Sequence, residues 1–163
     1  MQETEFVPIT AIVNGVSVMR QVPARQHLVE FLRESLGLTG SHLGCEHGVC
    51  GACTVRVDGE MVRGCLMLAA QCDGARIDTI EGLTESGALA DLQRAFHERN
   101  ALQCGFCSPG MLITALDLVE RQPPNVTRAE IREHLSGNYC RCTGYESIVD
   151  AVEAVCRARG SSR

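Results

Sequence analysis

The chain has 163 residues, is 45% hydrophobic and carries a formal net charge of −5, with 15 Arg and no Lys against 20 acidic residues. A negative balance is the wrong sign for a nucleic-acid binder, and no apolar run reaches membrane-spanning length. The start, MQETEFVPIT, has acidic residues where a signal peptide needs a basic region followed by an apolar one. We therefore expect a cytoplasmic chain of one or two small domains, with a protein or small cofactor as partner and with neither nucleic acid nor membrane.

The first predicted element is a β-hairpin. Two β-rich runs in 9–22 flank Asn14-Gly15, a pair that is typical of a tight turn with positive φ at both positions. In 26–36 the apolar residues return at helical spacing, which predicts a helix.

A second hairpin is predicted over 54–66, with its turn at Asp58-Gly59. A short extended run follows over 75–80. Together these elements fit a small mixed sheet that grips one helix over residues 1–80.

Beyond the sheet the pattern becomes helical. Apolar residues recur at helical spacing in 87–98. Ser108 is expected to cap the next helix and Pro109 to begin it, because proline loses no hydrogen bond at the first helical position. This helix is predicted to run over about 109–121 and to stop at Pro123-Pro124.

Two further helices complete the predicted helical part. Thr127 and Glu130 form a capping box for the first of them, and Gly137 is expected to close it. A fourth helix is predicted over 146–159. Four helices in 81–163 indicate a small bundle.

Ten cysteines stand in a chain that has no recognisable export signal. A reducing compartment does not keep structural disulfides, so metal ligation is the first explanation to consider. The cysteines form two groups with two outliers, which predicts two separate sites. They are Cys45, Cys50, Cys53, Cys65, Cys72, Cys104, Cys107, Cys140, Cys142 and Cys156.

The first group lies in the glycine-rich stretch GCEHGVCGACTV at 44–55 and on the hairpin after it. Its cysteines enclose four, two and then eleven residues, which is the plant-type spacing for a [2Fe–2S] cluster. Glycine allows the backbone to wrap closely around such a cluster and to adopt positive φ. The expected ligands are Cys45, Cys50, Cys53 and Cys65, with Cys72 as the only rival for the fourth place.

Two other metal centres were weighed for this group. Structural zinc prefers two closely spaced pairs of ligands, whereas here three cysteines share one loop. A Rieske centre needs two histidines, and only His47 stands in the required pattern, so it is interpreted as a loop side chain near the cluster. His42, just upstream, is expected to be solvated.

The second group consists of two close pairs, Cys104/Cys107 and Cys140/Cys142, with thirty-two residues between them. Zinc also fits two distant pairs, so spacing alone leaves that alternative open. Cys107 directly precedes Ser108, at a predicted helix N-terminus where the dipole favours an anion. The second pair lies between the last two helices, and both loops can meet at one end of a bundle. This context favours a second [2Fe–2S] site.

In this order the motifs resemble one family over nearly the whole chain. It is the small iron–sulfur subunit of molybdenum hydroxylases, the xanthine oxidase and carbon monoxide dehydrogenase family, as found in separate-subunit bacterial enzymes. The resemblance implies an α+β protein: an N-terminal β-grasp, plant-ferredoxin-like domain over 1–80, followed by an all-α four-helix-bundle [2Fe–2S]-binding domain over 81–163. The motifs are LTGSHLGCEHGVCGACTV at 38–55, TIEGL at 79–83, QCGFCSPGM at 103–111 and GNYCRCTGY at 137–145.

The resemblance also assigns residues. It places the second cluster nearer the molybdenum cofactor and favours Cys65 over Cys72 as a ligand of the first. Gln103 and Cys142 match positions that contact the pterin of molybdopterin, and their neutral interpretations are a capping amide and an ordinary ligand. Cys72 and Cys156 are then small buried side chains. The departures from the family pattern leave ligation intact; they are His42, Glu46, His47 and Ser108.

By resemblance, this chain is the electron-transfer subunit of an oxidoreductase and is not catalytic alone. A large subunit would hold molybdopterin and hydroxylate the substrate, and single electrons would pass through both clusters to FAD on a medium subunit. A dimer of heterotrimers is expected. The alternative is a free-standing two-cluster ferredoxin, and a third reading is a zinc-stabilised interaction module. The substrate is not predicted, because its contacts would lie on another chain.

Overall fold

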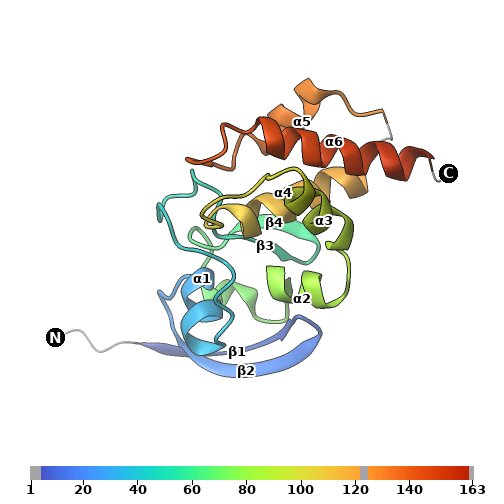
Figure 1. The fold of residues 1–163 in the computed structure, drawn as a ribbon. Helices are drawn as coiled ribbons and strands as arrows, with labels where there is room; N and C mark the ends of the chain where they lie inside the picture. Colours follow the sequence, from blue (N-terminus) through green and yellow to red (C-terminus); the bar gives the residue numbers. More distant parts are fainter. Residues whose placement is uncertain (1–4, 122–124, 162–163) are drawn as a thin grey trace.

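The computed structural model describes residues 5–121 and 125–161, so the predicted stop at Pro123-Pro124 lies outside the described residues. A five-stranded sheet comes first and helices follow, which is the predicted α+β order (Figure 1). In the described ranges, no helix is long and apolar enough to cross a membrane.

The N-terminal hairpin is confirmed. Strand β1 (Phe6–Val13) pairs antiparallel with β2 (Val16–Pro23). Asn14 and Gly15 both have positive φ, at 51° and 81°. The turn residues thus adopt the conformation that a two-residue hairpin loop requires.

The second hairpin is also confirmed. Strand β3 (Thr54–Val57) pairs antiparallel with β4 (Glu60–Arg63), and the turn residues Asp58 and Gly59 have φ of 51° and 85°. Strand β5 (Arg76–Asp78) lies between the hairpins, parallel to β1 and antiparallel to β3. The strand order is therefore β2-β1-β5-β3-β4.

The helix predicted over 26–36 is present as two continuous pieces. Helix α1 (Leu28–Glu30) passes into a π-helical turn, η1 (Phe31–Ser35), where the Leu36 N–H donates to the Phe31 carbonyl at 3.2 Å. A short 3₁₀ helix, η2 (Ala69–Cys72), covers the same side of the sheet. The core between sheet and helices includes Ile9, Val22, Leu28, Phe31, Leu32, Val55, Cys72 and Ile77.

The helical part contains one helix that the periodicity did not predict. Helix α2 directly follows β5 and buries Ile80 and Leu83 in the helical core. The division of the chain at residue 80 stays a prediction. The helices are α2 (Ile80–Glu85), α3 (Ala90–Glu98), α4 (Ser108–Arg121), α5 (Arg128–Leu135) and α6 (Glu146–Ser161).

The start of α5 matches the prediction, whereas its end differs. Thr127 Oγ1 accepts from the Glu130 N–H at 3.3 Å, and Glu130 Oε2 accepts from the Thr127 N–H at 2.7 Å, which completes the capping box. The helix ends at Leu135, and Gly137 does not adopt a left-handed conformation. Gly137 instead allows close approach: its carbonyl accepts from Arg63 Nη2 at 2.8 Å, and a Cβ would lie 2.7 Å from that nitrogen.

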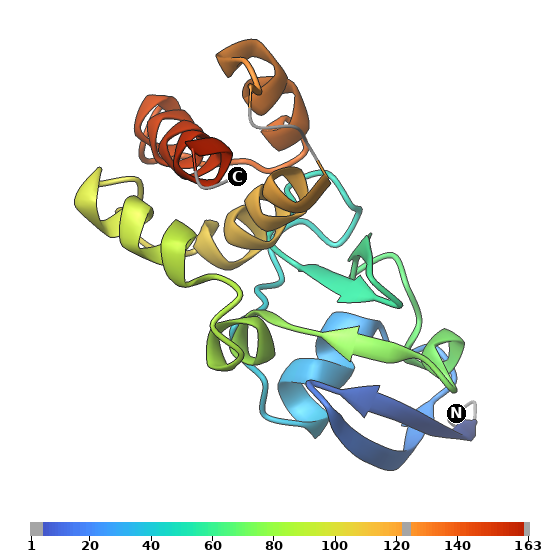
Figure 2. The same ribbon diagram turned by 90° about the vertical axis from the view of Figure 1, so that its right-hand side faces the viewer.

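Sheet and helices pack through β3 and α4 (Figure 2). Arg56 on β3 is buried, and its Nη2 forms an ion pair with Glu120 Oε2 on α4 at 2.7 Å. A buried cation needs such a partner, so this contact fixes how α4 lies against the sheet.

Candidate metal centres

The first four cysteines, which we term the outer site, lie together. The Cys50 N–H approaches Cys45 Sγ at 3.4 Å. Cys53 and Cys65 share a small buried cluster, and the Cys65 thiol interacts with both Cys53 and Cys45. The structure therefore brings the loop between η1 and β3 against Cys65, two residues after the end of β4.

Backbone amides and burial act in opposite directions at the outer site. The backbone N–H of Cys50, followed by that of His47, lowers the pKa of Cys45 to about 6. Burial, followed by the neighbouring Cys53 thiol, raises the pKa of Cys65 to about 11. The raised pKa of Cys65 favours its protonated thiol, so metal binding at this site must release the proton of Cys65.

The backbone of this loop fits a bulky anionic group. Gly48 and Gly51 have φ of +82° and +74°, as the glycine-rich sequence predicted. A Cβ on Gly44 would lie 3.1 Å from Cys50 Sγ and would narrow the space beside the sulfur. An amide directed at a cysteine sulfur is the type of contact that stabilises a cluster's negative charge.

The competing side chains have other partners. His47 Nδ1 hydrogen-bonds with the carbonyl of Cys45. Cys72 lies in the sheet core, where burial raises its pKa to about 11. Cys156 lies in the helical core, and burial raises its pKa as well. Both outlying cysteines are thus buried, as expected.

The second four cysteines, which we term the inner site, come from two loops that the helices bring together. Cys142 Sγ lies 3.5 Å from Cys104 Sγ. The Cys107 thiol interacts with the Cys140 thiol. The two predicted pairs therefore face each other, with one member of each pair opposite one member of the other.

Cys107 is even closer to the helix N-terminus than predicted. The Met111 N–H donates to the Cys107 carbonyl at 3.0 Å, so α4 already includes Ser108 and the cap position belongs to Cys107. The expectation that Ser108 caps the helix was wrong by one residue. The result places a candidate ligand directly at the positive end of the helix dipole.

The inner thiols also differ in acidity. Burial, followed by the Cys140 thiol, raises the pKa of Cys107 to about 12. The Phe106 N–H, followed by the Cys142 thiol, lowers the pKa of Cys104. Burial acts to raise the pKa of Cys140, but the Thr143 hydroxyl and nearby amides outweigh it, and the pKa is lowered.

Each site offers four sulfurs, a soft donor set that suits iron–sulfur clusters and also zinc. Throughout 5–121 and 125–161, no three Cys, His, Asp or Glu side chains are arranged to hold a single metal ion. The four sulfurs and the glycine-lined loop at the outer site, and the four sulfurs and the helix N-terminus at the inner site, fit [2Fe–2S] clusters.

The two residues matched to pterin contacts lie side by side. Gln103 Nε2 donates to the carbonyl of Cys142 at 3.1 Å, and Gln103 is exposed. The amide thus links the two loops of the inner site at the surface. Contact with a pterin stays a prediction.

A buried polar network joins the two sites, and sequence analysis missed it. The Tyr139 N–H donates to the Cys50 carbonyl at 2.9 Å. Asn138 is 2% exposed; its Nδ2 donates to the Gly51 carbonyl at 3.3 Å, and its Oδ1 accepts from Thr114 Oγ1 at 3.0 Å. The loop before Cys140 is therefore bonded to the loop that carries Cys50.

A second link comes from a histidine. His42 stacks on Phe106 with ring centroids 4.7 Å apart, and its Nδ1 lies 2.8 Å from the Phe106 carbonyl. His42 is half-buried, so it keeps part of the solvent contact expected for it, but it also has a partner on the other cysteine loop, more than sixty residues away in sequence.

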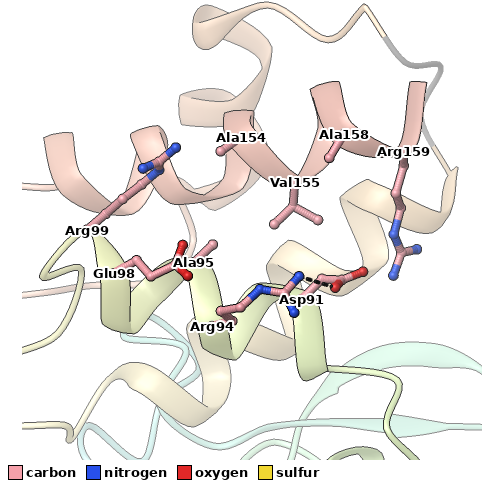
Figure 3. A pocket seen from close by; sticks show the side chains of 9 residues that line it. All are labelled: Asp91, Arg94, Ala95, Glu98, Arg99, Ala154, Val155, Ala158 and Arg159. Carbon is pink, nitrogen blue, oxygen red and sulfur yellow. Dashed lines mark hydrogen bonds and ion pairs between the residues drawn. The ribbon is translucent and has the colours of Figure 1, made fainter. Parts of the chain in front are cut away.

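A groove of about 610 Å³ lies between α3 and α6 (Figure 3). Ala95, Ala154 and Val155 are among its lining side chains, and Asp91 pairs with Arg94 at its edge at 2.7 Å. Its lining includes none of the ten cysteines, so we assign it no part in the metal sites.

Two protein families match different parts of the chain. A family described as "2Fe-2S iron-sulfur cluster binding domain" matches residues 11–84. A family described as "[2Fe-2S] binding domain" matches residues 79–153. The outer cysteines fall in the first range and the inner cysteines in the second.

Similar proteins cover almost the whole chain. It is 52% identical over 150 residues to caffeine dehydrogenase subunit gamma of Pseudomonas sp. (strain CBB1), covering 90% of this chain and 89% of that protein. It is 54% identical over 149 residues to the nicotine 6-hydroxylase small subunit of Paenarthrobacter nicotinovorans, with coverage of 91% and 89%. A chain of quinoline 2-oxidoreductase from Pseudomonas putida 86 superposes with a TM-score of 0.87 at 48% identity, covering 97% of both chains.

These similarities confirm the predicted fold class, a ferredoxin-like sheet domain followed by a helical domain, both of [2Fe–2S] type. They decide between the metals that spacing left open, because both matching families bind iron–sulfur clusters and neither is a zinc family.

Proposed function

This chain belongs to the small [2Fe–2S] subunits of the molybdenum hydroxylases and serves electron transfer in an oxidoreductase complex. We propose that it carries single electrons from molybdopterin on a large subunit to FAD on a medium subunit. When bound, two [2Fe–2S] clusters supply two one-electron centres. The observation that carries the proposal is the pair of four-thiol sites whose loops touch through the Cys50–Tyr139 hydrogen bond.

We assign the ligands by site. The thiols must lose their protons to bind iron, and the lowered pKa of Cys45 at the outer site and of Cys104 and Cys140 at the inner site favours that ionisation. The Cys50 amide and the N-terminus of α4 then stabilise negative charge at the outer and inner sites. The outer ligands are Cys45, Cys50, Cys53 and Cys65, and the inner ligands are Cys104, Cys107, Cys140 and Cys142.

The inner site is proposed to face molybdopterin. Gln103 and Cys142 lie together at the surface, where the pterin of a partner subunit could reach both. Gln103→Ala should slow electron transfer from molybdenum while both clusters stay assembled, because it removes one polar partner. If the inner cluster of the variant complex is reduced as fast as that of the parent complex, Gln103 does not contact the pterin.

Exposed apolar side chains around both sites support an obligate complex. Patches of this kind usually mark interfaces. The side chains are Val49 and Leu66 near the outer site, and Leu102, Phe106 and Tyr139 near the inner site. We propose that the medium subunit covers the first group and the large subunit the second, in a cytoplasmic dimer of heterotrimers.

The rival is a free-standing two-cluster ferredoxin. Purification of the native protein separates the two possibilities: we expect molybdenum- and flavin-bearing chains to co-purify with it. Recovery of a stable, cluster-replete monomer without either chain would favour the free carrier.

For the substrate, we propose an N-heteroaromatic ring as the class that the complex oxidises. The relatives named above act on caffeine and nicotine, and the similar structure is a quinoline oxidoreductase. Substrate contacts would lie on the large subunit, so a panel of N-heteroaromatic compounds tested on the purified complex is the experiment. Turnover of simple aldehydes alone would contradict this class.

A further inference from the structure

One inner cysteine is held by a tight turn that follows it. Thr143 Oγ1 lies 3.2 Å from Cys140 Sγ. The Cys140 N–H donates to the phenolic oxygen of Tyr145 at 2.9 Å, and the Tyr145 N–H donates to Thr143 Oγ1 at 3.1 Å. The sulfur and the amide of Cys140 are therefore both engaged by the same three-residue segment, which we term the 143–145 turn.

The backbone of this turn is unusual. Gly144 and Tyr145 both have positive φ, at 64° and 69°. Positive φ is uncommon for a bulky residue with a Cβ, because the Cβ crowds the backbone in this conformation. This conformation directs the tyrosine ring back along the chain, so that its oxygen meets the amide of Cys140. A backbone outlier whose side chain ends on a ligand's amide points to a role at that ligand.

Hydrogen bonds to sulfur tune the potential of an iron–sulfur cluster. A donor near the cluster stabilises the reduced state, because that state carries one more negative charge. When Cys140 binds iron as a thiolate, its Sγ has no proton to give, so the Thr143 hydroxyl 3.2 Å away is such a donor. The amide of the ligand itself, the Cys140 N–H, donates to the Tyr145 oxygen and is not free for the cluster. The 143–145 turn thus gives the Cys140 sulfur one hydrogen-bond donor, the Thr143 hydroxyl, and engages the Cys140 N–H elsewhere.

We propose that the 143–145 turn sets the reduction potential of the inner cluster, with Thr143 raising it through its hydroxyl and Tyr145 lowering it by keeping the Cys140 amide from the cluster. Both are positioning residues that act through Cys140. The inference rests on the proposed function only in requiring a cluster at the inner site.

The test is a redox titration of the purified complex, followed by the EPR signals of the two clusters. Tyr145→Phe frees the Cys140 amide, so the midpoint potential of the inner cluster should shift upward. The outer cluster is the internal reference and should keep its potential.

A second pair of variants, both at Thr143, tests for a shift of the inner midpoint potential in the opposite direction. Thr143→Val removes the hydroxyl and should shift the inner potential downward, whereas Thr143→Ser keeps it and should restore the original value. Opposite shifts from Tyr145→Phe and Thr143→Val, both confined to the inner signal, support the proposal. An inner potential that neither variant moves overturns it, as does an equal shift of both clusters. If the complex with the parent sequence shows no EPR signal from an inner cluster, that result contradicts the proposed function instead.

Discussion

The outer site takes three of its four thiols from nine consecutive residues, whereas the inner site takes two pairs from loops that α4 and α5 separate. The outer ligands therefore depend mainly on one loop and an adjacent hairpin. The inner ligands meet only if the helices pack correctly. The comparison teaches that similar cofactor sites in one chain can differ in what assembles them: local sequence in one case and tertiary structure in the other.

The largest expected effect comes from removing one ligand at each site. Cys50→Ser should abolish the outer EPR signal and Cys107→Ser the inner one, and iron should fall from about four to about two atoms per chain. Each thiol belongs to a different site, so the other signal should persist. Loss of both signals from either change, in a folded protein, would contradict two separate sites.

A smaller effect is expected from the network that joins the sites. Asn138→Ala leaves the Gly51 carbonyl and the Thr114 hydroxyl without their side-chain partner, and should lower the free energy of unfolding by about 1–3 kcal/mol. Chemical denaturation measures this. Both clusters should be released at lower denaturant than in the parent protein, because Asn138 lies two residues from Cys140 and bonds to Gly51, which follows Cys50.

Asn125→Ala is the matched control for that change. Asn125 is exposed, so its removal should leave stability within experimental scatter. Equal effects of the two alanine variants would argue against a role for the buried amide.

Arg128→Ala tests whether the inner site depends more than the outer site on the packing of α5 against α6. Arg128 on α5 pairs with Glu146, Asp150 and Glu153 on α6 at 2.6–2.9 Å, and these contacts hold together the helices that flank the Cys140 loop. We expect faster loss of the inner cluster on exposure to an iron chelator, with the outer cluster unchanged. Arg94→Ala, which breaks an ion pair within α3, is the control and should change neither rate.

The smallest effect concerns pH. A hydrogen bond from Arg132, and then its charge, lowers the pKa of Glu146 below its ordinary value of 4.5. The folded chain therefore binds this proton less tightly than the unfolded chain, and the resulting stability is present above pH 4.5 and is lost as pH falls through the lowered pKa. Glu146→Gln should reduce the acid-induced loss of stability in urea titrations, and an identical pH dependence of both proteins would refute the linkage.

Sequence was most informative where structure is local. The turns at Asn14-Gly15 and Asp58-Gly59 follow from residues that tolerate positive φ, and the Thr127–Glu130 capping box needs only four residues. The spacing of the outer cysteines likewise indicated a single loop.

Contacts between the two halves were beyond sequence reasoning. The partner of His42 is Phe106 and that of Asn138 is Gly51, and neither pair leaves a periodic signal in a single sequence. Gly137 was interpreted as a helix terminator, although its lack of a side chain serves the approach of Arg63. Such residues are placed by packing, which depends on the whole fold.

The measurement that tests the central claim most directly is quantitative EPR of the natively purified complex after full reduction. Two clusters with separate ligands predict two signals that differ in relaxation and integrate to about one spin each per chain, with about four irons and four acid-labile sulfides. A single signal of about one spin, or zinc in place of iron at either site, would contradict the account.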